Sequence, residues 1–248
     1  MNIISFGNYW KTSYKKKEPI EWIVLREDDD KMYIISRFCL DCVPYCDGHQ
    51  LAWKNSFMRE WLNGYFLDVA FTPEEQSRII LSEIKTSREI HFLGKGTATQ
   101  DKVFLPSLAE AHIYFGQAGL YNLSLHAKRI ARPTDYAVVR GCWASSLKYS
   151  PVKNSVLRDC LLRDRELTGG AVNPNVPVWQ VTEEIIKEYG TIGKDTAKKR
   201  YAACWFLRSP GSELVYVNYD GSVGYMDKKY ISSFEQHIAI RPAMWISK

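Results

Sequence analysis

The sequence lacks long hydrophobic runs. No apolar stretch approaches the roughly 20 residues that a membrane-spanning helix requires. The segment from Met1 to Gly7 also lacks the basic region and following apolar stretch of a signal peptide. We therefore expect no membrane insertion and a chain that is cytoplasmic as synthesised. Export by another route or association with a virion stays open.

The common catalytic motifs are absent as well. The sequence contains no G-x-S-x-G, no Walker-type phosphate loop and no G-x-G-x-x-G after a strand. Its 5 histidines show no H-E-x-x-H or comparable spacing. We therefore expect no cofactor and no catalytic residues, and enzymatic activity is the less favoured possibility.

Cysteines are too few and too scattered for a small scaffold held together by disulfides. Three of the 6 cysteines nevertheless lie close together in the sequence, at Cys39, Cys42 and Cys46. His49 follows them closely. Such ligands could hold a tetrahedral zinc ion. The spacing, however, matches no common zinc ribbon or finger, and a buried thiol at Cys39 would pack as a small hydrophobe. We predict no metal and keep zinc at these four residues as the weaker alternative.

Neither sign of charge dominates, since 33 basic residues face 28 acidic ones. The basic triplets 15–17 and 198–200 are not interleaved with aromatic residues, so nucleic acid is not an expected partner.

Aromatic residues are abundant in this sequence, with 8 Trp, 15 Tyr and 10 Phe. They can build the core of a fold with little regular structure, or they can supply a recognition surface.

Strand patterns occupy both ends of the chain. Apolar, β-branched and aromatic residues gather at 3–6, 20–25, 32–36 and 238–246. Pro242 cannot donate a hydrogen bond to a sheet, so the last strand is expected at an edge or a bulge. The sequence shows no internal repeat. These patterns favour a single domain, residues 1–248, with both chain ends in one sheet.

Helix signals lie between these ends. Asn55 or Ser56 can cap a helix whose apolar stripe includes Trp61. Capping boxes begin at Thr72 and at Ser107, and the second predicts a helix to about residue 115. Alternating residues at 78–86 are compatible with a strand.

The C-terminal third contains a hairpin signal. Strand-like residues 214–218 and 222–226 flank Tyr219, Asp220 and Gly221, and Asp-Gly supplies the positive φ angles of a tight turn. By contrast, residues 147–200 are rich in loop-forming residues. A loop-rich stretch of this length inside a compact domain is uncommon and is often functional.

Several blocks of sequence, in this order, resemble the bacterial family called domain of unknown function 6273. They are Phe6-Gly7, Pro19 to Trp22, Trp53 to Ser56, Arg59 to Asn63, Phe66, Ala70 to Thr72, Asp101 to Ser107, Thr134 to Ala137, Trp205 to Gly211 and Arg241 to Trp245. The family in turn resembles the formylglycine-generating-enzyme and C-type-lectin-like group. That group includes the variable proteins of diversity-generating retroelements, which display changeable residues on a rigid scaffold.

The resemblance implies an α+β, C-type-lectin-like fold that is loop-rich, with small antiparallel sheets, a few helices and adjacent chain ends. It implies that 147–200 is an inserted or elaborated loop. The enzymes of the group act through cysteines or a bound metal, and their cysteine pair does not map onto this chain. We interpret the blocks at 205–211 and 241–245 as structural, with Arg208 and Arg241 pairing with a carboxylate or with loop carbonyls.

The leading functional hypothesis is a non-enzymatic module that binds or displays a protein or glycan through its loops and its C-terminal hairpin. Tyrosine, asparagine and aspartate combine contact area with polar reach. The expected ligand-binding residues are Tyr216, Asn218, Tyr219, Asp220, Tyr225, Asp227 and Tyr230. The alternatives are an enzyme of the formylglycine-generating type and a structural component of a phage or secreted assembly. The sequence indicates neither the ligand nor the oligomeric state.

Overall fold

The computed structural model describes residues 2–46, 51–86, 97–116, 129–142, 144–145, 202–209, 211, 213–218, 221, 223–227 and 237–248. The segment 147–200, expected to be an insertion, lies outside these residues.

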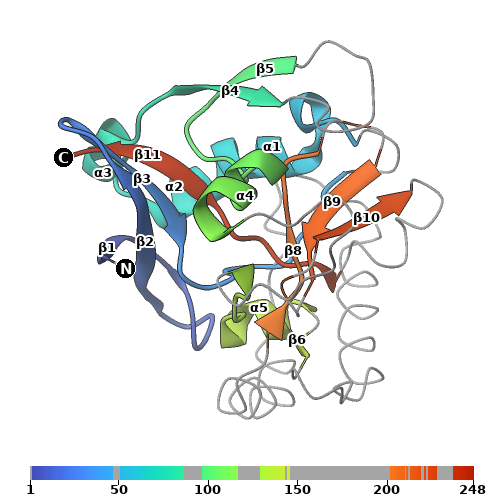
Figure 1. The fold of residues 1–248 in the computed structure, drawn as a ribbon. Helices are drawn as coiled ribbons and strands as arrows, with labels where there is room; N and C mark the ends of the chain where they lie inside the picture. Colours follow the sequence, from blue (N-terminus) through green and yellow to red (C-terminus); the bar gives the residue numbers. More distant parts are fainter. Residues whose placement is uncertain are drawn as a thin grey trace.

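Short strands outnumber helices in the described chain (Figure 1). The strands are β1 (Ile3–Trp10), β2 (Lys17–Glu27), β3 (Lys31–Ser36), β4 (Ser82–Thr86), β5 (Thr97–Asp101), β6 (Ala144–Ser145), β7 (Ala202–Ala203), β8 (Trp205–Phe206), β9 (Glu213–Val217), β10 (Val223–Asp227) and β11 (Ala243–Ser247). The helices are α1 (Phe57–Trp61), α2 (Leu67–Ala70), α3 (Pro73–Arg78), α4 (Leu108–Phe115) and α5 (Asp135–Val139), with a 3-10 turn at Trp53–Asn55 and a π-helical turn at Leu62–Phe66.

The strands form small antiparallel sheets. A four-stranded sheet has the order β1-β2-β3-β11, and a three-stranded sheet has the order β10-β9-β8. Two further pairs join β4 to β5 and β6 to β7. The predicted α+β class with small antiparallel sheets and few helices is therefore confirmed.

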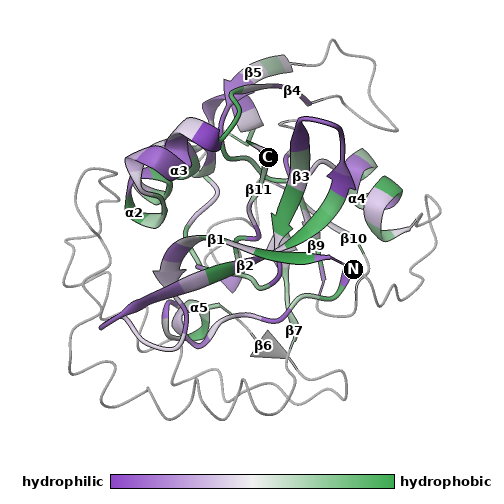
Figure 2. Ribbon diagram, turned by 90° about the vertical axis from the view of Figure 1, so that its left-hand side faces the viewer, coloured by the Kyte–Doolittle hydropathy of each residue, from purple (hydrophilic) through white to green (hydrophobic). Residues whose placement is uncertain are grey.

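The first and last strands share the four-stranded sheet, as the sequence predicts, but they form its opposite edges. The chain ends therefore meet in one sheet without being neighbouring strands. Strand β11 pairs with β3, and Pro242 precedes it directly. The missing donor of proline is tolerated there because Pro242 lies just outside the strand, where its carbonyl oxygen accepts from the Ser36 N–H. Figure 2 shows hydrophobic residues along the middle of β2 and β3 and hydrophilic ones at the turn between them.

The caps predicted for the helices are present. Ser56 accepts a hydrogen bond from the Arg59 N–H and caps α1. Complete capping boxes begin α3 at Thr72 and α4 at Ser107, and α4 ends at Phe115. The expectation for 78–86 is wrong in its first half, because the helix continues through Arg78 and the strand starts only at Ser82. Among the described residues, no helix is long and apolar enough to cross a membrane.

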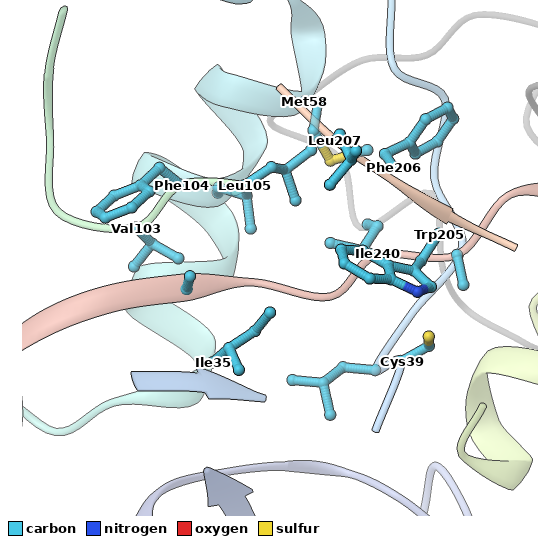
Figure 3. Packing of buried hydrophobic residues seen from close by; sticks show 14 of the residues in the cluster. Ile35, Cys39, Met58, Val103, Phe104, Leu105, Trp205, Phe206, Leu207 and Ile240 are labelled. Carbon is cyan, nitrogen blue, oxygen red and sulfur yellow. The ribbon is translucent and has the colours of Figure 1, made fainter. Parts of the chain in front are cut away.

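The core joins segments that are far apart in the sequence. Figure 3 shows Met58 of α1, residues 103–105 and residues 205–207 packing together around Ile240. Trp22, Trp53 and Trp205 are fully buried. Much of the unusual aromatic content therefore belongs to the interior, which allows a fold with short strands to bury enough apolar area.

Gly7 occupies a bulge in β1, where the pairing register with β2 shifts between Ser5 and Asn8. Its φ of +71° is a conformation that residues with a side chain rarely adopt. A Cβ atom there would lie 2.5 Å from the ring of Phe71 and 2.8 Å from the Ala70 carbonyl oxygen.

Gly7→Ala is therefore expected to lower the free energy of unfolding by about 2 kcal/mol. Urea unfolding would measure the loss. The matched control is Gly64→Ala, because nothing lies within 4 Å of the added Cβ in that helical turn. The control should leave stability unchanged or raise it by up to about 1 kcal/mol. Equal effects of the two substitutions would contradict the assignment of strain to Gly7.

Candidate functional site

The block at 205–211 forms part of the core. Trp205, Phe206 and Leu207 are fully buried, and Arg208 is 4% exposed. The guanidinium group of Arg208 uses all three nitrogens. Nε donates to the Thr86 hydroxyl, and the Nη atoms donate to the carbonyls of Leu105 and Lys85.

A second set of bonds joins this block to α4. Nη2 of Arg208 lies 3.0 Å from the carboxylate of Glu110, the same carboxylate that completes the capping box of α4. The phenol of Tyr33 also donates to Glu110. Arg208 thus ties β4, the loop before α4 and α4 itself together, as expected of a structural cation.

Arg241 is buried against aromatic rings. Its guanidinium carbon lies 4.9 Å from the centre of the Trp205 ring and 5.2 Å from that of Phe115. Its Nε donates to the Ser36 carbonyl. Burial lowers the pKa of Arg241 to about 10, so it is still a cation at neutral pH. These contacts link the two C-terminal blocks through Trp205.

The predicted hairpin is present as β9 and β10. Its register pairs Tyr225 with Val215 and Gly224 with Tyr216. Directly paired residues of an antiparallel ladder share one face of the sheet. The predicted binding residues therefore divide between two faces.

Tyr216 and Asn218 point to the same face, as alternation along a strand predicts. The Cys204 thiol donates a hydrogen bond to the Asn218 side-chain oxygen over 3.9 Å. Burial, followed by the proximity of Cys204, raises the pKa of Tyr216. The Tyr216 ring covers Gly224, since a Cβ atom there would lie 2.4 Å from it. This face contributes to packing.

Tyr225 and Asp227 lie on the opposite face of β10 and are exposed, whereas Met226 between them is buried. Tyr225 is 52% exposed. The remaining predicted binding residues, Tyr219, Asp220 and Tyr230, lie outside the described residues. The candidate binding surface is therefore Tyr225 and Asp227 on strand β10, which forms an edge of its sheet.

The cysteine cluster does not assemble a metal site within the residues that the structure describes. Cys39, Cys42 and Cys46 are all buried. No group of three or more His, Cys, Asp or Glu side chains in the described ranges is placed to hold a metal ion. His49 lies outside those ranges. Burial raises the pKa of Cys39 to about 12 and that of Cys42 further.

The sequence did not predict two buried groups of polar side chains, each centred on one aspartate. Asp41 accepts hydrogen bonds from Tyr9 and Arg140. Asp101 accepts from Trp53, Thr99 and Arg59 over 2.6 to 2.9 Å.

The contacts of Asp101 with Trp53 and Arg59 join three blocks of the family resemblance, those at 53–56, 59–63 and 101–107. Asn63 joins the last two of these blocks as well, because its oxygen accepts from the backbone of Lys102 and Val103. The only signal for these contacts in the sequence was that Trp53, Arg59, Asn63 and Asp101 stand in blocks of the family resemblance.

One family model matches residues 29–248, and its description is domain of unknown function (DUF6273). The match covers most of the chain, including the block at 53–63, the signature at 205–211 and the closing strand. Comparison with curated proteins and with solved structures found no match. The chain belongs to the DUF6273 family.

Proposed function

We propose that this protein is a non-enzymatic binding module that recognises a protein or glycan through the β9–β10 hairpin and its neighbouring loops. The observation that carries the proposal is the exposure of Tyr225. The exposed large hydrophobic side chains of the described residues are Ile3, Leu81, Ile113 and Tyr225. Tyr225 is the one aromatic among these four, and a tyrosine offers both a ring and a hydroxyl to a ligand.

The hairpin provides a rigid base for this residue. Leu214 and Val217 of β9 are fully buried, and Met226 anchors β10 from the face opposite Tyr225. Asp227 lies two residues from Tyr225 on the same face and adds a carboxylate. A rigid aromatic anchor beside an adaptable polar group is the arrangement that recognition surfaces favour.

We further propose that the scaffold is C-type-lectin-like. Two features support this assignment. The end strands share one sheet, and a separate small sheet presents the hairpin.

The described cysteines do not support the alternative that this protein is an enzyme of the formylglycine-generating type. Cys39, Cys42, Cys46, Cys142 and Cys204 are all buried. Burial raises the pKa of Cys142 well above its usual value, as it does for Cys39 and Cys42. A nucleophilic cysteine instead needs access and a lowered pKa.

A glycan array and a panel of immobilised proteins, probed with the wild type, would test the binding function. For any ligand found, Tyr225→Ala should weaken binding by at least about tenfold, as expected when a central aromatic contact is truncated. Asp227→Asn should weaken it less. Isothermal titration calorimetry would measure both affinities.

Leu81→Ala is the control, because Leu81 is 59% exposed and precedes β4 in a different sheet. It should leave affinity unchanged. All three variants should retain wild-type stability within about 0.5 kcal/mol, because each side chain is exposed. Unchanged affinity in both hairpin variants would refute the placement of the site.

A further inference from the structure

Arg129 is a buried cation that has no counter-charge among the described residues. Its side chain is fully buried. Within the part of the chain that the structure describes, Nε, Nη1 and Nη2 of this residue have no hydrogen-bond partner. A guanidinium group carries five N–H donors and stays protonated in proteins. Such a group is costly to bury alone, because nothing replaces the water that it loses.

The other buried arginines contrast with Arg129. Arg140 donates to the carboxylate of Asp41, and Arg208 contacts the carboxylate of Glu110. Arg241 donates to the Ser36 carbonyl and stacks on aromatic rings. The fold thus provides each of these three side chains with an acceptor. Arg241 keeps one nitrogen, Nη1, without a hydrogen-bond partner, whereas Arg129 has no partner at any of its three nitrogens among the described residues.

The surroundings of Arg129 hold the backbone in place. Its carbonyl oxygen accepts a hydrogen bond of 3.0 Å from the indole of Trp205 in β8. The Trp205 ring packs against Phe115 of α4. Residue 129 therefore lies beside the contact between β8 and α4.

A second basic group, His112, lies on helix α4, which also carries Phe115. His112 precedes Phe115 by three residues, which places both on one side of α4. Burial, followed by the positive charge of Arg129, lowers the pKa of His112. A negative group at this point would be attracted by the guanidinium and could accept a hydrogen bond from the imidazole.

We propose that Arg129 is the anchor of an anion-binding site beside α4 and β8, and that the site takes the oxyanion group of a ligand, a carboxylate or a phosphate. The planar fork of a guanidinium matches two oxygens of either group and forms short, charge-assisted hydrogen bonds with them. Trp205 positions the backbone of Arg129, and His112 flanks the site. The proposal does not depend on the hairpin surface, since it uses none of its residues.

Thermal unfolding in a zwitterionic buffer containing chloride, with inorganic phosphate or acetate added separately, would test the site. The wild-type Tm should rise with the logarithm of the anion concentration above the Kd, by about 5 °C at 100 times the Kd. A larger response to phosphate would identify a phosphate group, and a larger response to acetate would identify a carboxylate. Nuclear magnetic resonance should show the imidazole signals of His112 shifting as the anion binds.

Arg129→Met removes the charge while keeping an apolar side chain of similar length. It should abolish this logarithmic response and the shift of the His112 signals, and without added anion it should be at least as stable as the wild type. The matched control is Arg132→Met, since Arg132 is exposed and lies three residues further along the chain. It loses the same charge and should respond to the anion as the wild type does.

Two results would overturn the proposal. In the first, added anions change the Tm of all three proteins equally and in proportion to the anion concentration, as general salt effects do. In the second, Arg129→Met is much less stable than the wild type and the wild type shows no response to either anion. The counter-charge would then be a carboxylate of the chain itself rather than a ligand.

Discussion

Replacing Asp41 with alanine is expected to lower the free energy of unfolding by about 3–5 kcal/mol, because it removes the carboxylate that pairs with the buried guanidinium group of Arg140. Asp41 is 1% exposed and Arg140 is 3% exposed. Their side chains meet at 3.3 Å, and the Tyr9 hydroxyl donates to the other carboxylate oxygen over 2.6 Å. Urea unfolding followed by tryptophan fluorescence would measure the loss.

A double variant separates the charge effect from simple loss of packing. Adding Arg140→Met to Asp41→Ala should recover part of the stability, because the buried cation is removed along with the carboxylate that it pairs with. Asp29→Ala is the control, since Asp29 is exposed in the turn between β2 and β3. It should change stability by less than about 0.5 kcal/mol. A loss below about 1 kcal/mol for Asp41→Ala would mean that water replaces the carboxylate.

Arg208→Ala is expected to cost about 3 kcal/mol of unfolding free energy. The Leu105 carbonyl and the Thr86 hydroxyl are buried, and each would lose a donor worth about 1–3 kcal/mol. Arg208→Lys should lose less, because the ammonium keeps the charge near Glu110 but cannot reach acceptors spread around a planar fork. Chemical denaturation of both variants would measure the difference.

Arg26→Ala is the control for Arg208, because the Arg26 side chain is 58% exposed and pairs with Asp28 at the surface. Its removal should change stability by less than about 1 kcal/mol. If Arg208→Ala instead kept wild-type stability and abolished the binding of a ligand, Arg208 would be a ligand-binding cation. The four contacts of its guanidinium group argue against that outcome.

Local elements were predictable where a short pattern carries a strong physical constraint. The capping boxes at Thr72 and Ser107 satisfy backbone donors within three residues. The Asp220-Gly221 turn signal required only its immediate neighbours, and strands β9 and β10 flank it as predicted. The strand expected over 78–86 failed in its first half, because α3 extends to Arg78 and alternation over a few residues does not distinguish a helix end from a strand start.

The candidate site was predictable only in part. The hairpin was identified, and Tyr216 and Asn218 do share a face. The division of the predicted set between a packing face and an exposed face depends on the pairing of β9 with β8 and β10. Tyr216 is partly buried beside Cys204, whereas Tyr225 is exposed. Residues on one strand cannot reveal which face the rest of the chain will cover.

The sequence by itself determined the class of the fold, the positions of the capped helices and the hairpin, and the family, because those features depend on neighbouring residues or on ordered blocks. The tertiary structure alone decided which charges are buried and what they contact. Asp41 meets Arg140 across 99 residues, and Arg208 meets Leu105 across 103. Such contacts arise from packing, and packing also left Arg129 without an acceptor among the described residues. The contribution of a buried charge to stability depends on the group that it pairs with, and no local pattern in the chain specifies that group.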